Sequence, residues 1–95
     1  MPAKQLIKIL INGRVQGVGF RYFAYRQARR LDLTGYVKNL PSGEVEIVAC
    51  GEPDSLEMFI NTIKKGTPFS MIESFTLKDV NPSEFPGSFE NFHII

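Results

Sequence analysis

The sequence has few of the residues on which disulfide, metal and histidine chemistry depend. Its 95 residues include one cysteine, one histidine and no tryptophan. The single cysteine, Cys50, cannot form an internal disulfide, and this favours a reducing compartment. One cysteine and one histidine, His93, also give no cluster at metal-ligand spacing. The chain therefore lacks the side chains of a disulfide-rich secreted domain and of a zinc centre.

A strong charge and a long apolar run are also missing. Eleven basic and ten acidic residues give a formal net charge of +1, whereas proteins that bind nucleic acid through its phosphates usually carry a larger basic excess. No run reaches the roughly 18 apolar residues of a membrane span, and the first five residues contain no signal-peptide core. We therefore expect a soluble cytoplasmic protein without a nucleic-acid or membrane partner.

What the chain does contain is the composition and periodicity of one small globular domain over residues 1–95. Hydrophobic residues make up 43% of the chain, which is in the globular range. Alternating and helical apolar patterns, with turn residues between them, divide the chain into strands and helices. We predict strands at Leu6–Ile11, Thr34–Leu40, Glu44–Cys50, within Ser70–Val80 and at about Glu90–Ile94, helices at about Arg21–Leu31 and from Pro53 to a stop at Gly66, and a loop at Asn81–Ser88.

This order, β-α-β-β-α-β, is that of the α+β ferredoxin-like sandwich. We expect an antiparallel sheet with both helices on one face, because the strands are apolar on one side. In the third strand Val45, Ile47 and Ala49 should face the helices, while the side of Glu44, Glu46 and Val48 should be largely wet. Such a fold does not by itself name a function.

The stretch from Gly13 to Arg21, with the sequence GRVQGVGFR, joins the first strand to the first helix. Two glycines one residue apart allow a sharp turn in which several amides point into one concavity, and the helix adds its own unpaired amides. These features suit an anion, most simply phosphate. A cation such as Arg21 in the first helical turn costs about 0.3–1 kcal/mol against the dipole, and a facing anion would offset that cost.

A plain turn is the alternative interpretation of this stretch. Neither the P-loop nor the dinucleotide fingerprint is present, because no Gly-Lys-Ser/Thr and no third glycine follow. Elsewhere, His93 is expected at a strand edge and Cys50 as an unreactive, at least half-buried thiol. Glu44 and Glu46 do not make a convincing acid–base pair. Asn39 remains, either as a turn-starting residue bonded to the local backbone or as part of a site.

Two long motifs then make the sequence similar to a known family. Gly13–Arg21 resembles the first signature of the acylphosphatases, and Gly35–Asn39, followed by Gly43, Val45 and Gly51, resembles the second. The resemblance covers nearly the whole chain and weakens after about Phe69. It implies the ferredoxin-like fold and the hydrolysis of acyl phosphates to a carboxylate and inorganic phosphate, without a metal or any other cofactor.

The resemblance also implies roles for individual residues. Arg21 matches the arginine that binds the phosphoryl group, and Asn39 matches the asparagine that orients the attacking water. The backbone cradle would be formed by Arg14, Val15, Gln16, Gly17, Val18, Gly19 and Phe20. No general acid is needed, because the leaving carboxylate has a conjugate acid of pKa roughly 4. We expect a monomer whose partners are a small acyl phosphate and inorganic phosphate.

Two other functions stay open at this point. Acylphosphatase-like domains also occur inside larger carbamoyl-transfer enzymes, so the chain could bind phosphate without hydrolysing an acyl phosphate. The presence of both Arg21 and Asn39 in a chain of this length favours a free hydrolase. Ferredoxin-like sheets can also bind RNA through aromatic residues on the open face. The expected open-face residues carry no aromatic pair and include two carboxylates: Leu6, Lys8, Leu10, Glu44 and Glu46.

Overall fold

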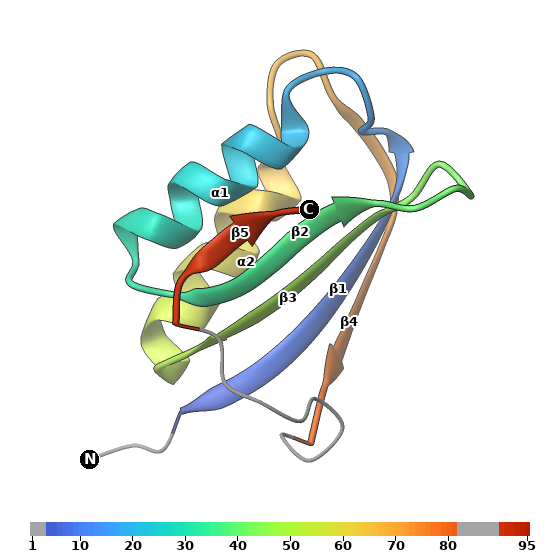
Figure 1. The fold of residues 1–95 in the computed structure, drawn as a ribbon. Helices are drawn as coiled ribbons and strands as arrows, with labels where there is room; N and C mark the ends of the chain where they lie inside the picture. The colour runs from blue at the N-terminus through green and yellow to red at the C-terminus, as the bar shows by residue number, and fades with distance from the viewer. Residues whose placement is uncertain (1–3, 82–89) are drawn as a thin grey trace.

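The computed structural model of the protein describes residues 4–81 and 90–95. Its elements follow the predicted β-α-β-β-α-β order, with a short strand at the end (Figure 1). They are β1 (Gln5–Arg14), α1 (Phe20–Arg30), β2 (Thr34–Asn39), β3 (Val45–Gly51), α2 (Pro53–Lys65), β4 (Met71–Asp79) and β5 (Phe92–Ile94). The predicted loop at Asn81–Ser88 lies, apart from its first residue, outside the described residues.

The strands form one sheet in the order β4-β1-β3-β2-β5. β1 pairs with β3 and β4, and β2 pairs with β3, all antiparallel. The prediction of an antiparallel sheet is wrong for the last pair, because β5 runs parallel to β2, with Gly35 opposite Phe92. The last residue of β4 and the first residue of β2 lie at the same end of the strands, since the register places Asp79 beside Ile7 and Thr34 beside Cys50. A strand that follows β4 and joins the far side of β2 therefore runs in the direction of β2.

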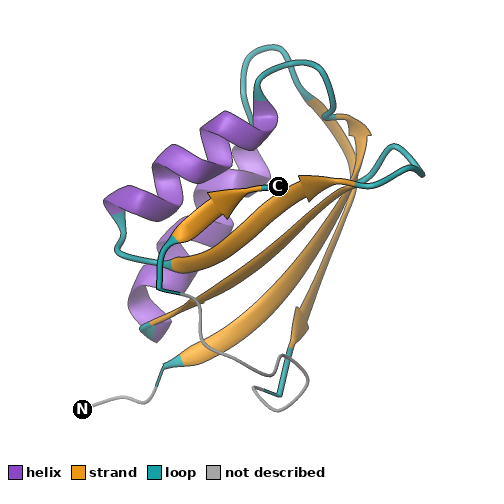
Figure 2. Cartoon of the chain, in the orientation of Figure 1, coloured by secondary structure: helices purple, strands orange, loops and turns teal. Residues whose placement is uncertain are grey.

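Both helices cover the same face of this sheet, as predicted (Figures 1 and 2). The buried stripe of α1 is Phe20, Ala24 and Ala28, and that of α2 is Leu56, Phe59 and Ile63. These residues share one core with the inward side chains of the strands, and removal of that apolar surface from water is the main favourable term in folding. The strand residues of this core are Ile7, Ile9, Ile11, Val37, Val45, Ile47, Ala49 and Phe92.

The opposite face of the sheet is less wet than predicted. Val48 is fully buried in a second, smaller cluster with Leu6 and Val80, against which Tyr36 packs. Glu46 is only 8% exposed. The alternation along β3 alone suggested exposure, but β1 and β2 lie on either side of it and their long side chains cover it.

Two polar side chains on this face pair with the buried carboxylate of Glu46. The Tyr36 hydroxyl donates a hydrogen bond of 2.9 Å to Glu46 Oε2, and Lys8 Nζ lies 3.1 Å from Glu46 Oε1. A buried carboxylate without such partners would strongly destabilise the fold. The three side chains come from adjacent strands, so the contact depends on the register of the sheet.

This contact predicts a change in stability at alkaline pH. Burial, followed by the hydrogen bond to Glu46 and its charge, raises the pKa of Tyr36 from 10.0 to about 12. The folded chain holds the phenol proton more tightly than the unfolded chain, so the stabilisation is complete below about pH 10 and is lost between about pH 10 and pH 12. Urea unfolding at about pH 9 and about pH 11 should show a larger loss of stability for the wild type than for Tyr36→Phe. An equal loss in both proteins would contradict this assignment.

Neither helix within residues 4–81 and 90–95 is both long enough and apolar enough to cross a membrane.

Candidate active site

The loop between β1 and α1 begins later than the sequence suggested. β1 does not end at Ile11 but continues to Arg14, because its pairing with β4 shifts register between Asn12 and Gly13 and then resumes. The shift skips Glu73 of β4, which is the pattern of a β-bulge in β4, and a bulge increases the local twist of the pair. The loop itself is therefore only residues 15–19, held between the end of a paired strand and the start of a helix.

Two apolar side chains anchor this loop to the core. Val15, the first residue of the loop, and Phe20, the first residue of α1, are each 1% exposed, and Val18 packs against the same core from within the loop. Gly17 and Gly19 have φ angles of +75° and +78°, which residues with a Cβ adopt at a cost of roughly 1–2 kcal/mol. A Cβ built on either glycine meets no atom within 4 Å. The glycine backbone therefore borders open space.

That open space is a pocket of about 200 Å³. Most of its lining comes from the loop and the first turn of α1, and one residue comes from the end of β5. The lining residues are Val15, Gly17, Gly19, Phe20, Arg21, Tyr22 and Ile94.

The first turn of α1 presents backbone donors beside this pocket. Gly19 is the N-cap and provides no side-chain cap, and the first turn contains no acidic residue. The amide of Phe23 makes a helical hydrogen bond to the Gly19 carbonyl, at 3.0 Å. The amides before it, from Phe20 to Tyr22, have no acceptor within the helix, and the positive end of the dipole lies with them.

Arg21 lines the pocket from the same turn and is partly exposed. Its Nη1 donates a 3.2 Å hydrogen bond to the backbone oxygen of Ile95, which holds the side chain toward the end of β5. A guanidinium has five N–H donors in a planar fork, so this single bond leaves enough of them to bind two oxygens of an anion.

Asn39 is the last residue of β2, opposite Val45. Its Oδ1 is buried and accepts no hydrogen bond from any residue that the structure describes. Asn39 does precede the β2–β3 turn, but the predicted alternative in which its side-chain oxygen bonds the local backbone is wrong. A buried acceptor without a partner lowers the stability of the fold by about 1–3 kcal/mol. Such an acceptor is suited to bind a water molecule or a ligand.

The predicted cradle residues divide into two groups. Val15, Gly17, Gly19 and Phe20 line the pocket, whereas Arg14, Gln16 and Val18 do not. Arg14 is the exposed last residue of β1, paired with Met71. The Gln16 side chain reaches the β2–β3 turn, where its Nε2 donates 2.9 Å hydrogen bonds to the carbonyls of Leu40 and Glu44.

Two lining residues were not singled out from the sequence. Tyr22 follows Arg21 directly and is 58% exposed, so its place beside the candidate arginine was an available signal. Ile94 belongs to β5, and only the parallel pairing with β2 brings it to this end of the sheet.

The positions of His93 and Cys50 agree with the sequence prediction. His93 is exposed on the edge strand β5, and Cys50 is a free, partly buried cysteine beside the Val48 cluster. No three His, Cys, Asp or Glu side chains within residues 4–81 and 90–95 lie close enough to hold a metal ion together.

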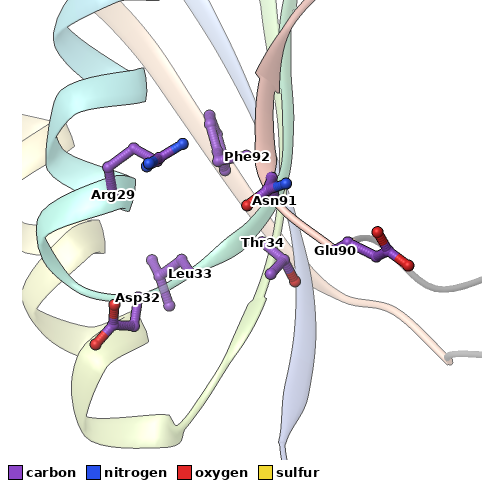
Figure 3. Close-up of a pocket in the computed structure, with 7 residues that line it drawn as sticks. All are labelled: Arg29, Asp32, Leu33, Thr34, Glu90, Asn91 and Phe92. Atoms are coloured by element: carbon purple, nitrogen blue, oxygen red, sulfur yellow. The ribbon is translucent and has the colours of Figure 1, made fainter.

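A second pocket, of about 190 Å³, lies where β2 begins, at the opposite end of that strand from Asn39. Figure 3 shows Arg29 extending from α1 toward Phe92. Asp32 and Glu90 also line this pocket. None of the residues predicted for the site lines this pocket. It supplies a useful comparison, because Arg29 is on the same helix as Arg21.

Fold and pocket together define a class of protein: a ferredoxin-like α+β sandwich with an amide- and arginine-lined pocket between β1 and α1. Comparison with known proteins identifies the family within this class. The acylphosphatase family model matches residues 7–94. An acylphosphatase of Archaeoglobus fulgidus is 47% identical over 72 residues, which are 76% of this chain and 81% of that protein.

Solved structures agree. The crystal structure of acylphosphatase from Bacillus subtilis is 35% identical, with a TM-score of 0.87 over 98% of this chain and 99% of the other. The whole chain also matches 12% of full-length HypF, solved in a phosphate- and nucleotide-bound form, with 34% identity and a TM-score of 0.89. The chain belongs to the acylphosphatase family. Its activity is that of the family, the hydrolysis of acyl phosphates.

Proposed function

We propose that Arg21 and the amides of residues 14–20 bind the phosphoryl group while Asn39 orients the water that attacks it. The hydrolysis needs an electrophilic phosphorus held in place, a water in line with the breaking bond and a leaving group able to carry charge. The loop amides and Arg21 at the pocket can meet the first requirement, and Asn39, which is not among the residues that line the pocket, would meet the second from the end of β2.

The phosphoryl group would occupy the space beside Gly17 and Gly19. Backbone amides there and in the first turn of α1 can donate to its oxygens, and Arg21 can bind two of them through its fork. Phosphoryl transfer spreads charge over the equatorial oxygens, and stabilisation of that charge by positioned donors supplies most of the catalysis. Arg14, Gln16 and Val18 would contribute to this cradle through their main chain only.

The buried, unpartnered Oδ1 of Asn39 carries this proposal. A water that donates one hydrogen to this oxygen is held with a lone pair free for attack at phosphorus. As the new P–O bond forms, the bond from phosphorus to the acyl oxygen breaks, and its electron pair leaves on the carboxylate. The second hydrogen of the water passes to a phosphate oxygen, which yields inorganic phosphate.

No protein acid is required for this step. A carboxylate whose conjugate acid has a pKa of roughly 4 departs without a proton at neutral pH. We therefore propose a reaction that needs no metal or other cofactor. We also propose that the protein acts as a monomer in the cytoplasm, since one chain supplies every group invoked and its thiol, Cys50, suits a reducing compartment.

Turnover of benzoyl phosphate in the presence of EDTA tests the metal-free mechanism. We expect saturable hydrolysis that is unchanged by the chelator and competitively inhibited by inorganic phosphate. Loss of activity with EDTA and its return with a divalent cation would contradict the mechanism. Phosphate binding without turnover would instead support the non-hydrolytic alternative. Elution of the active protein as a dimer in size-exclusion chromatography would contradict the proposed monomer.

Substitution of Gly17 separates strain from obstruction. Gly17→Ala should lower stability by roughly 1–2 kcal/mol, since alanine tolerates the positive φ poorly, and should also raise the inhibition constant of phosphate because its Cβ enters the pocket. Asparagine adopts this conformation more readily, so Gly17→Asn should recover stability without recovering phosphate affinity. Recovery of both would mean that the space above Gly17 is not the anion site.

A further inference from the structure

The Gln16 side chain connects two parts of the site that are distant in sequence. Gln16 lies in the loop between β1 and α1, and its Nε2 is 2.9 Å from the Leu40 carbonyl oxygen and 2.9 Å from that of Glu44. The first contact spans 24 residues and the second 28, and both are partly buried. In Figure 1 this loop and the β2–β3 turn lie at the same end of the sheet.

The two acceptors are the carbonyls at the base of the β2–β3 turn. The Leu40 amide donates to the Glu44 carbonyl at 2.8 Å, and the Gly43 amide donates to the Leu40 carbonyl at 3.0 Å. Each carbonyl oxygen has a second lone pair, and Gln16 uses both of these. The orientation of its amide is fixed, because the alternative would place its oxygen against two other oxygens.

Leu40 directly follows Asn39, so this contact acts at the end of the strand that carries Asn39. We propose that Gln16 is a positioning residue: it sets the distance between the phosphate-binding loop and Asn39, so that the water on Asn39 lies in line with phosphorus. This inference rests on the proposed function of the site. A side chain that donates both amide hydrogens across the gap restrains the two segments more than one bond would.

A purely structural tie would give the same contacts but different kinetics. A tie that only stabilises the loop would, when removed, weaken phosphate binding and the fold together. A positioning residue would, when removed, lower kcat while the loop still binds phosphate. A displacement of about 1 Å in a reacting group can cost about 100-fold in rate.

The variants to compare are Gln16→Ala, Gln16→Glu and Ser42→Ala. Gln16→Glu keeps the shape but, when ionised, has no hydrogen to donate to the two carbonyls. Ser42→Ala removes two exposed bonds in the same turn, one from Ser42 Oγ to Glu44 Oε1 at 3.1 Å and one from the Glu44 amide to Ser42 Oγ at 3.4 Å, without touching the loop. It serves as the matched control. Both Gln16 variants should lower kcat for benzoyl phosphate by about 10- to 100-fold, and Ser42→Ala should have almost no effect.

Two further measurements separate positioning from support. The inhibition constant of inorganic phosphate should change less than about threefold in the Gln16 variants. In the Asn39→Ala background, Gln16→Ala should cost little more in kcat, because residues that act as a unit are not additive. An unchanged kcat, a parallel rise in the inhibition constant, or additive losses would each overturn the proposal.

A measurement without turnover distinguishes this inference from the proposed function. The side-chain amide resonances of Asn39 should move in Gln16→Ala and stay in place in Ser42→Ala, whether or not the protein hydrolyses benzoyl phosphate. If Gln16→Ala does not fold, Gln16→Glu gives the same comparison. Unmoved Asn39 resonances in an active wild type would reject the inference alone, whereas an inactive wild type would reject the proposed function.

Discussion

Replacing Arg21 by alanine should lower kcat/KM for benzoyl phosphate by about 100- to 1000-fold, equivalent to about 3–4 kcal/mol of transition-state stabilisation. The physical reason is the loss of two charge-assisted hydrogen bonds to oxygens whose charge grows in the transition state. The fold should survive, because a cation in the first turn of a helix opposes the dipole and its removal relieves that cost. Steady-state kinetics, with circular dichroism to check folding, measure both effects.

Two companion variants make the Arg21 result specific. Arg21→Lys should also be poor, because a point charge cannot reproduce the planar fork. Arg29→Ala removes the same charge from the same helix, at an exposed position beside the second pocket. There the Cζ atom of Arg29 lies 5.7 Å from the centroid of the Tyr25 ring. This variant should keep near-native activity. Equal losses in Arg21→Ala and Arg29→Ala would indicate a general effect of charge and reject the assignment of Arg21.

Replacing Asn39 by alanine should lower kcat by about 100-fold while the inhibition constant of inorganic phosphate changes less than about threefold. Phosphate binding should persist because the amides and Arg21 remain. The rate should fall because the buried Oδ1 that orients the water is gone. Kinetics and phosphate inhibition measured on the same preparation separate the two effects.

The neighbour of Asn39 provides the control for that result. Lys38 is on the opposite face of β2, since successive strand residues alternate, and in the register it lies opposite Glu46. Lys38→Ala should therefore leave kcat nearly unchanged. A rise in the phosphate inhibition constant without a fall in kcat in Asn39→Ala would reject the water-orienting role.

The sequence predicted those parts of the fold that depend on local pattern. The buried faces of α1, α2 and β1 were predicted correctly, because the spacing of apolar residues along each element indicates which face is buried. The direction of β5 could not be predicted, because it depends on which strand edge is free at a distant point of the sheet. The burial of Glu46 was missed for the same reason: its partners Tyr36 and Lys8 come from neighbouring strands.

Part of the candidate site could likewise be predicted from the sequence, and part could not. The glycines and Arg21 are adjacent in sequence, and their shared pocket follows from a strand-to-helix turn. Asn39 was singled out by its position at a strand end and then by resemblance, but its unpartnered oxygen is visible only in three dimensions. The direction of the Gln16 side chain also depends on long-range packing, and no local pattern indicates that it reaches the β2–β3 turn.

The most direct test is a titration of the ¹⁵N-labelled protein with inorganic phosphate in EDTA, followed through the backbone amide resonances. We expect saturable shifts at Gly17, Gly19 and Arg21, which are lost in Arg21→Ala, and no comparable shifts at Thr34 or Asn91 beside the second pocket. Saturable shifts at Thr34 and Asn91 instead, or shifts at Gly17 and Gly19 that persist unchanged in Arg21→Ala, would contradict a phosphate site built from these amides and this arginine.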